Sequence, residues 1–308
     1  MWLTLTSNLL FWRGLILNNL GPYLNLLLRM RLLLMLHSWL ESTDGNGATM
    51  RAVLFDFPKA LDLIDHHFLA QKLSSYDFPE SIMCWILDFL TNRRQRVKLS
   101  CDCVSGWRAV PAGVPQGPNL GPWLFLIMIN DLSVANTSIW KYVDDTTLVE
   151  CVEKNGTSSM QSRVHEFVTK SRADGFLLNE SKCKELTISF TKSEKPLEPI
   201  TINNTKIEVV PSAKLLGVMM SNDLKWNAHV EMICKKVAAR LYFLRQLRRA
   251  KVLTNDLLSF YATCIGPVAE YACPVFHTAL IIIIIIIIIC IIKTYRCKKR
   301  KAGIGRTV

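Results

Sequence analysis

The sequence has 308 residues, of which 50% are hydrophobic, and a formal net charge of +12 at pH 7. This length and apolar content are ample for a buried core, while the charge excess favours a polyanionic partner, either nucleic acid or an anionic membrane surface. The ten cysteines are scattered without CxxC or Cys/His ligand spacing, which argues against a structural zinc site or a disulfide framework. We expect reduced, mostly buried thiols and a location in the cytoplasm or nucleus.

The two ends of the chain differ in composition from its middle. Residues 1–35 are rich in Leu and Asn but lack the order of a secretory signal, and Arg29 and Arg31 argue against a membrane helix there. At the other end, Ile281–Ile289 is a run of nine isoleucines, followed by a basic tail. Two interpretations stay open: translated simple-repeat DNA, which we favour, or a tail anchor. A membrane contact is expected only through residues 275–292.

Between these ends, apolar runs bounded by turn residues predict strands, and apolar residues three or four apart predict helices. In chain order, the patterns predict a strand over Ala52–Phe55, a helix through Ile82–Phe89 after Pro79, strands over Arg94–Leu99 and Trp107–Val110 around a turn at Ser105-Gly106, and an apolar run over Leu120–Leu132 that is long enough for a helix. They next predict a hairpin of Ile139–Tyr142 and Thr146–Val152 with Asp144-Asp145 at its turn, a helix over Arg163–Phe176 and an extended segment over Glu185–Phe190.

The remaining elements shift from strands to helices. The patterns predict a hairpin of Ile200–Ile202 and Ile207–Val209 around Asn203-Asn204, a strand over Leu215–Met219, a long helix with Val230, Ile233, Val237, Leu241 and Leu244 on one face, and a second helix over Thr254–Ile265. This order predicts an α+β fold. We expect a mixed or antiparallel sheet with helices on one face, followed by a region of helices alone.

The adjacent carboxylates Asp144 and Asp145 are the first candidates for chemistry, because like charges at close range repel each other. A divalent cation between them would relieve the repulsion, and Mg²⁺ prefers oxygen ligands from one or two carboxylates and substrate phosphates. Asp56, at the end of a neighbouring strand, would complete a two-metal site that activates an attacking hydroxyl and stabilises a leaving oxygen. The alternative is an ordinary polar hairpin turn, where Asp is common.

Five segments in the correct order resemble the motifs of non-LTR retrotransposon reverse transcriptases. They are Asp56–His66, Gly113–Gly117 with the segments 120–122 and 129–132, Tyr142-Val143-Asp144-Asp145, Leu178-Asn179 with Lys182 and Lys184, and Leu215-Leu216-Gly217. The resemblance covers roughly residues 36–276. It implies a right-hand polymerase palm of the split βαβ type over 36–222 and a helical thumb-like region over 223–278, flanked by an unmatched segment, 1–35, and the poly-Ile segment with its basic tail, 279–308.

The resemblance implies an RNA-directed DNA polymerase that uses two Mg²⁺ ions, with Mn²⁺ as an alternative, an RNA template, a DNA primer and deoxynucleoside triphosphates. It does not indicate an oligomeric state. The implied roles are metal binding for Asp56, Asp144 and Asp145; proximity to the leaving pyrophosphate for Lys182 and Lys184; nucleotide binding for the Phe57 carbonyl, Leu61, Gln116 and Gly117; and primer or nucleic-acid binding for Tyr142, Leu216, Gly217, Lys236 and Arg240. Ordinary solvated or packing roles stay open for the two lysines and for Tyr142.

The helix that begins near Asn227 carries an excess of positive charge, with Glu231 as the only acid between that residue and Lys251. A stripe of basic residues suits phosphate contacts, which hold a duplex without reading its sequence. The alternative is a solvated helix face. The predicted nucleic-acid contacts Lys236 and Arg240 belong to this stripe.

Three departures from the family pattern predict impaired activity. Leu61 stands where an aromatic that excludes the ribose 2′-hydroxyl is usual, Pro58 and Pro118 stand where Ser is usual, and nothing before Leu36 resembles the fingers that bind the triphosphate. We therefore expect weak or absent polymerisation. The alternatives are a non-catalytic nucleic-acid-binding remnant and a tail-anchored membrane protein with a vestigial palm.

Overall fold

The computed structural model describes residues 21–45, 47–76, 78–100, 102–115, 120–191 and 197–276, without the side chains of residues 21–29. The chain divides into two compact units, one formed by residues 42–210 and the other by residues up to 41 together with those from 211. The predicted domain boundaries at 35, 222 and 278 stay predictions. The poly-Ile segment, most of the proposed anchor and the basic tail lie outside the described residues.

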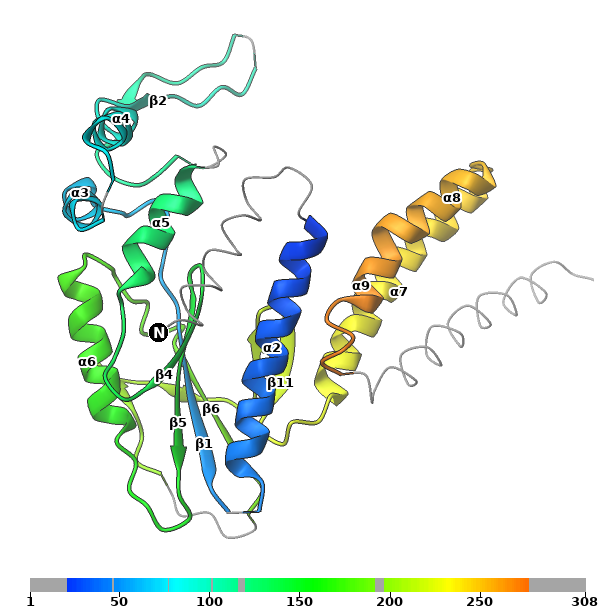
Figure 1. Ribbon diagram of the computed structural model, residues 1–308. Coiled ribbons are helices and arrows are strands. Elements are labelled where there is room, and N and C mark those ends of the chain that lie inside the picture. Colours follow the sequence, from blue (N-terminus) through cyan, green and yellow to red (C-terminus); the bar gives the residue numbers. More distant parts are fainter. Residues whose placement is uncertain are drawn as a thin grey trace, which may run out of the picture. The chain divides into compact units, whose positions relative to one another are not determined.

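The centre of the unit 42–210 is a five-stranded sheet in the order β4-β5-β1-β6-β9. Its strands are β1 (Thr49–Phe55), β4 (Ser138–Tyr142), β5 (Asp145–Val152), β6 (Lys184–Ser189) and β9 (Glu208–Val209). Neighbours pair antiparallel except β6 and β9, which run parallel. Four consecutive residues of the central strand β1, Met50 to Val53, are buried, and since successive side chains of a strand point to opposite faces, both faces of β1 are covered. The prediction of a mixed sheet in an α+β fold is confirmed (Figure 1).

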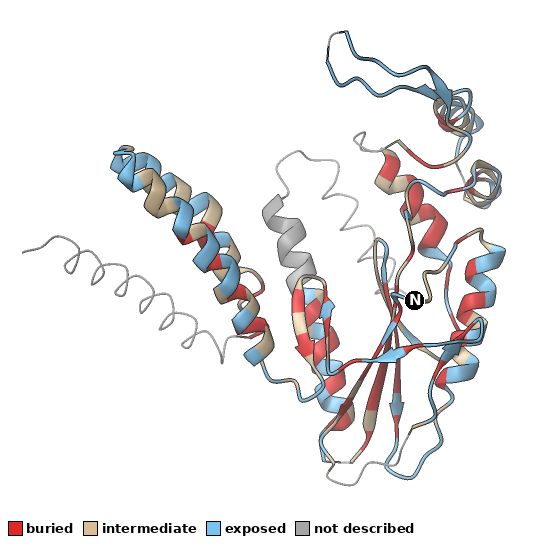
Figure 2. Cartoon of the chain, turned by 180° about the vertical axis from the view of Figure 1, so that it is seen from behind, coloured by how far each residue is buried: buried red, intermediate tan, exposed pale blue. Residues whose placement is uncertain are grey.

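Four helices belong to the same unit: α3 (His66–Ser74), α4 (Glu80–Leu90), α5 (Leu120–Asn130) and α6 (Met160–Ala173). Helix α6 packs on one face of the sheet, where the rings of Phe55 and Phe167 have centroids 4.2 Å apart. Asp65 caps α3 by accepting hydrogen bonds from the amides of His67 and Phe68. The predicted helices are thus present. Figure 2 shows that burial concentrates in the sheet, α5 and the inner side of α6.

A buried ion pair lies under the start of α6. Arg51 on β1 and Glu185 on β6 are each 2% exposed, with 2.7 Å between Nε and Oε1. The guanidinium also donates to the hydroxyl of Ser158 and to the carbonyl of Glu198. Burial alone would raise the pKa of the neighbouring Glu150, but hydrogen bonds from Ser158 and Ser159 outweigh it and lower that pKa. Charged groups are therefore held inside the sheet face by a hydrogen-bonded network.

Two predicted hairpins differ from the structure, the first in its turn and the second in one of its arms. The pairs Arg94↔Ala109 and Gln95↔Arg108 join β2 (Arg94–Gln95) to β3 (Arg108–Ala109). The amide of Leu99 donates to the carbonyl of Cys103, and the amide of Ser105 donates to the carbonyl of Val97. Ser105 thus belongs to the second arm, and the prediction of a turn at Ser105-Gly106 was wrong. The strands are also much shorter than predicted. Both faces of this hairpin are exposed, and no core fixes a longer ladder.

The second misplaced hairpin involves the segment 200–209. Asn203 and Asn204 do form a turn, both at positive φ, which Asn tolerates better than other residues. The arms are β7 (Thr201–Ile202) and β8 (Thr205–Lys206), whereas Glu208–Val209 joins the main sheet as β9. The prediction of Ile207–Val209 as the second arm was wrong. The local sequence predicts the turn correctly, but the residues beyond it pair with β6 of the main sheet instead of with the first arm of the hairpin.

The second unit contains α2 (Gly21–Thr43), the hairpin of β10 (Ser212–Leu215) and β11 (Val218–Ser221), and α7 (Asn227–Arg249). It also contains α8 (Thr254–Phe260), the π-helix η1 (Tyr261–Ile265) and α9 (Gly266–Glu270). The single strand predicted over Leu215–Met219 was wrong, because Leu216-Gly217 is a turn. On α7, Val230, Ile233, Val237 and Leu241 are buried as predicted, and Leu244 is half-buried.

Two expectations from composition can be compared with the described residues. Among the described cysteines only Cys183 is buried, so the expectation of mostly buried thiols was wrong. Within the described ranges, none of the helices combines the length and the apolar character needed to cross a membrane.

His229 makes the second unit sensitive to acid. Its side chain is 1% exposed, Nδ1 accepts a hydrogen bond from the Met219 amide, and Nε2 has no hydrogen-bond partner. Burial, with a smaller contribution from Lys236, lowers the pKa of His229 to about 4. Since the unfolded chain takes up this proton near pH 6.5 and the folded chain near pH 4, the contribution to stability is complete above pH 6.5 and is lost as pH falls through this window.

We therefore expect acid to cost this unit roughly 3 kcal/mol of unfolding free energy between pH 7 and pH 4 through His229 alone. Urea titrations at both pH values measure it. His229→Gln should remove this component, whereas His165→Gln, at an exposed histidine of the other unit, should leave it intact. An identical pH dependence in the wild type and His229→Gln would contradict the assignment.

Candidate active site

Asp56 lies directly after β1, at the end of the sheet where β5 begins (Figure 1). The register pairs Phe55 with Thr146, so one step further along the ladder brings Asp56 opposite Asp145. The Asp56 side chain is 40% exposed, yet its Oδ2 is buried without a hydrogen-bond partner. Lys182 Nζ lies 3.7 Å from that oxygen. A buried carboxylate oxygen without a hydrogen-bond partner is suited to a cation.

The turn between β4 and β5 carries the other two carboxylates. Tyr142 pairs with Asp145, so the turn consists of Val143 and Asp144, and Asp145 is the first residue of β5. The prediction that both acids occupy the turn was therefore wrong. Val143 has φ +53°, a strained value for a β-branched residue. Its side chain packs against the core, which holds the turn in this conformation and leaves Asp144 exposed at the tip.

A turn after Phe176 positions Lys182 beside Asp56. The amide of Asn179 donates to the carbonyl of Asp56, and the amide of Lys182 donates to the carbonyl of Asn179. Cys183 is buried behind Asp56, and this burial raises the pKa of its thiol to about 11. The thiol is therefore neutral. Of the two predicted lysines, only Lys182 is placed near Asp56 by an ion pair, while Lys184 begins β6 opposite Leu54.

The loop after Asp56 is tied to the segment 113–114 by backbone hydrogen bonds. The amide of Gly113 donates to the carbonyl of Ile64, and the amide of Val114 donates to the carbonyl of Leu61. Gly113 has φ +84°, and a Cβ there would lie 2.5 Å from the carbonyl oxygen of Asp62, so only glycine fits. Leu61 is half-buried against the core. Gln116 and Gly117, the other predicted nucleotide contacts, lie outside the described residues.

His66 is a contact that the sequence reasoning missed. Its Nε2 donates to the carbonyl of Gly113 over 2.7 Å, which fixes the start of α3 to the segment that leads toward Gln116. The signal was present in the sequence, since His66 follows the helix cap Asp65 directly. A histidine directly after a helix cap is interpreted as an ordinary helix residue, however. No local pattern predicts its hydrogen bond to a carbonyl 47 residues away.

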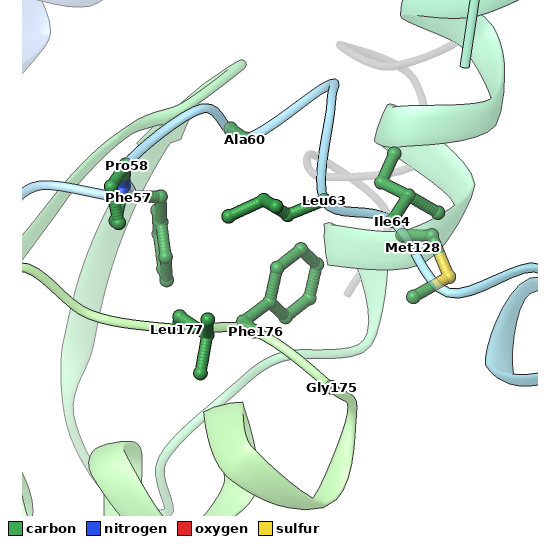
Figure 3. Close-up of a pocket in the computed structure, with 9 residues that line it drawn as sticks. All are labelled: Phe57, Pro58, Ala60, Leu63, Ile64, Met128, Gly175, Phe176 and Leu177. Carbon is green, nitrogen blue, oxygen red and sulfur yellow. The ribbon is translucent and has the colours of Figure 1, made fainter. Parts of the chain in front are cut away.

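A shallow pocket of about 270 Å³, including the part open to solvent, lies beside the same loop. Figure 3 shows the side chains of Phe57, Leu63 and Phe176 around it. All nine lining residues are apolar or glycine, so the pocket offers no ligand to a phosphate or a metal. Because the Phe57 side chain is buried here, only its backbone carbonyl is left for the predicted role near the nucleotide.

The predicted primer contacts of the second unit form a separate group. Leu216 and Gly217 make the turn of the β10–β11 hairpin, and the hydroxyl of Tyr271 donates to the Leu216 carbonyl over 2.7 Å. Lys236 is exposed on α7. Arg240 donates instead to the carbonyl of Cys264 in the π-helix η1. Lys236 is thus available to a phosphate, while Arg240 satisfies a helix carbonyl.

The three carboxylates share one end of the sheet without forming a closed ligand set. In the described part of the chain, no three His, Cys, Asp or Glu side chains lie close enough together to hold a metal ion. The donor types still fit a hard divalent cation, because all three are carboxylates and Asp56 has an oxygen without a hydrogen-bond partner.

Comparisons with known proteins identify the family of the chain. The model of the family described as reverse transcriptase (RNA-dependent DNA polymerase) matches residues 25–220. A second model, described as the N-terminal part of alkylated DNA repair protein alkB homolog 8, matches residues 226–266. Among solved structures, apo telomerase from Candida tropicalis has 14% identity and a TM-score of 0.45 over 65% of this chain and 38% of its own.

Curated relatives come from insect transposons. The probable RNA-directed DNA polymerase from transposon X-element of Drosophila melanogaster is 25% identical over 239 residues, which are 74% of this chain and 26% of the relative. The RNA-directed DNA polymerase from mobile element jockey of Drosophila funebris is 25% identical over 238 residues, 73% of this chain and 25% of the relative. The chain thus spans about a quarter of their length. Because the family model covers more than half of the chain, the chain belongs to the reverse transcriptase family, as its resemblance to non-LTR enzymes predicted.

Proposed function

We propose that this chain carries the palm and a thumb-like region of an RNA-directed DNA polymerase of a retrotransposon. The observation that supports the proposal best is the buried Asp56 Oδ2, which has no hydrogen-bond partner and lies at the end of β1 where β5 brings Asp145 alongside. A carboxylate oxygen in this condition is costly unless a cation compensates it. If Asp144 were only an ordinary polar turn residue, nothing would explain why the nearby Asp56 oxygen is buried without a hydrogen-bond partner.

Reverse transcriptases generally use divalent metal ions, and Asp56, Asp144 and Asp145 would hold two Mg²⁺ ions in this chain. When bound, the ions would lower the pKa of the primer hydroxyl and neutralise charge on the phosphates. Asp56 would contribute its buried oxygen Oδ2, which has no hydrogen-bond partner. The strained turn at Val143 holds Asp144 at the tip of the hairpin, where its carboxylate can reach a cation without disturbing the sheet.

The remaining residues would bind and orient the substrates. Lys182, whose Nζ lies 3.7 Å from Asp56 Oδ2, would neutralise charge on the leaving pyrophosphate or donate a proton to it. Tyr142 precedes the turn that carries Asp144 and would align the primer end. Gly113 leads the backbone toward Gln116 and Gly117, which would position the incoming deoxynucleoside triphosphate over the RNA template. Leu61 packs on the core. Because leucine has no aromatic ring, this position would offer no aromatic barrier to a ribose 2′-hydroxyl.

A specific observation favours a second candidate function, a non-catalytic nucleic-acid-binding remnant. The carboxylates are not gathered into a closed ligand set, whereas the exposed Lys236, Arg248 and Arg249 of α7 remain available to phosphates. Such a chain would hold RNA or DNA without extending a primer. The two candidates make the same prediction for binding and different predictions for synthesis.

Primer extension on a primed RNA template separates the two. We expect the purified chain to extend the primer with Mg²⁺, slowly because of the departures at Pro58 and Leu61, and to stop when EDTA removes the ion. Restoring Mg²⁺ in excess should restore synthesis. A folded chain that binds the primed template but never extends it, with either Mg²⁺ or Mn²⁺, would contradict the polymerase and support the binding remnant. Rapid extension would instead contradict the expected impairment.

A further inference from the structure

The hairpin formed by β2 and β3 lies outside every role proposed so far. From Arg94 to Ala109 all described residues are exposed, including Val97 at 63%, Leu99 at 81% and Trp107 at 55%. A two-stranded hairpin with no core on either face is marginally stable by itself, and clustered exposed apolar side chains indicate a binding surface. We call residues 93–109 the arginine hairpin.

The charge of the arginine hairpin is strongly positive. It carries five basic residues, Arg93, Arg94, Arg96, Lys98 and Arg108, and one acid, Asp102. None of the five takes part in an ion pair within the described residues. Concentrated charge of one sign that the protein does not neutralise is complementary to a polyanion, and it disfavours an apolar protein partner.

Aromatic rings and guanidinium groups pair with each other on the hairpin and on the adjoining end of α4. The guanidinium of Arg96 lies over the ring of Trp107, 4.6 Å from its centroid, and that of Arg93 lies over Phe89 at 4.8 Å. Trp85 on α4 stacks on Phe89 with centroids 6.2 Å apart, and its own side chain is 58% exposed. Bases of an unpaired strand stack on exposed aromatic rings and on guanidinium planes, whereas paired bases are already stacked on each other.

We propose that the arginine hairpin, together with Trp85, binds an unpaired stretch of RNA, the template strand ahead of the site of synthesis. The choice of RNA rests on the proposed function, because a polymerase that copies RNA holds its DNA primer paired to the template and leaves only the template unpaired. In Figure 1 the hairpin follows α4 and lies beyond the end of the sheet at which β1 ends, the end that carries Asp56.

Fluorescence anisotropy with a labelled 20-nucleotide oligouridylate, in EDTA and with the full chain, tests the surface without requiring synthesis. Trp107→Ala should weaken binding by about 5- to 150-fold, the range for loss of one base–aromatic stack, and Trp107→Phe should recover most of it. Arg94→Gln/Arg96→Gln should reduce the slope of log affinity against log salt by about 1.4, which is 0.7 for each lost phosphate contact. The matched control, Lys154→Gln/Lys206→Gln, removes the same charge from exposed positions outside the hairpin and should leave Trp107-dependent binding unchanged.

Because the Trp107 side chain is exposed, Trp107→Ala should have the same melting temperature as the wild type. A loss of binding can then be distinguished from a loss of folding. A 4-thiouridine probe should cross-link to the peptide 93–109. Unchanged affinity in Trp107→Ala, equal loss in the lysine control, or preference for oligothymidylate or for duplex RNA over the single strand would each overturn the proposal. A chain that fails in primer extension but shows the Trp107-dependent binding would reject the polymerase and retain the RNA surface. If the chain extends the primer but Trp107→Ala does not change its affinity for oligouridylate, the RNA surface is rejected and the polymerase is retained.

Discussion

Asp144→Asn is expected to reduce Mg²⁺-dependent primer extension by at least about 100-fold, while affinity for the primed template stays within about twofold of the wild type. Even groups that only support metal ligands cost about 10- to 100-fold in metal affinity or activity when they are removed, and Asp144 is proposed to bind the metal itself. The substitution keeps the side chain's shape and removes its charge. Since Asp144 is exposed at the tip of the hairpin, the fold should not change.

The control for this loss is Asp256→Asn, the same exchange at an exposed residue in the first turn of α8. Its extension rate should match the wild type. Single-turnover extension at rising Mg²⁺ and Mn²⁺ concentrations measures the rate and metal affinity separately, and filter binding measures template affinity. If Asp144→Asn extended the primer at the wild-type rate, Asp144 would be a turn residue and the proposed metal site would be wrong.

The outcome for this turn illustrates what sequence reasoning can locate and what it misses. The apolar runs on either side of it predicted β4 and β5 correctly, because burial dictates those positions. The turn itself was misplaced by one residue. Turn propensity favours Asp144-Asp145, while the structure uses Val143 at φ +53°, a conformation that no propensity assigns to a β-branched residue. Packing of Val143 on the core overrides the local preference.

Long-range contacts account for most of the remaining differences. Asn203-Asn204 was predicted as a turn because asparagine tolerates positive φ, but the capture of Glu208–Val209 by β6 depends on a parallel pairing that spans the intervening hairpin. The contact of His66 with the Gly113 carbonyl, 47 residues away, is likewise invisible in local patterns. Asp56 was located correctly, because an apolar run that ends in a carboxylate is itself a local pattern.

Arg51 is a core residue that local patterns also do not predict, since an arginine in a strand ordinarily faces solvent. In this chain it is 2% exposed and paired with Glu185. We expect Arg51→Met to lower the free energy of unfolding of the unit 42–210 by about 3–5 kcal/mol, because removal of one partner leaves the other charge buried without compensation. The cost should be high because Glu185 Oε2 already has no hydrogen-bond partner.

The double variant Arg51→Met/Glu185→Leu distinguishes an uncompensated charge from lost packing. When both partners of a buried pair are replaced by apolar residues of similar volume, the change is often neutral or stabilising, so the double variant should recover most of the loss. The unpaired hydroxyl of Ser158 and carbonyl of Glu198 should keep the recovery incomplete. The exposed pair Lys170–Glu166 is the control, and Lys170→Met should change the free energy of unfolding far less than Arg51→Met does. Urea unfolding at pH 7 measures all three variants. A double variant no more stable than Arg51→Met alone would show that the guanidinium stabilises the sheet through its packing and hydrogen bonds rather than by compensating Glu185.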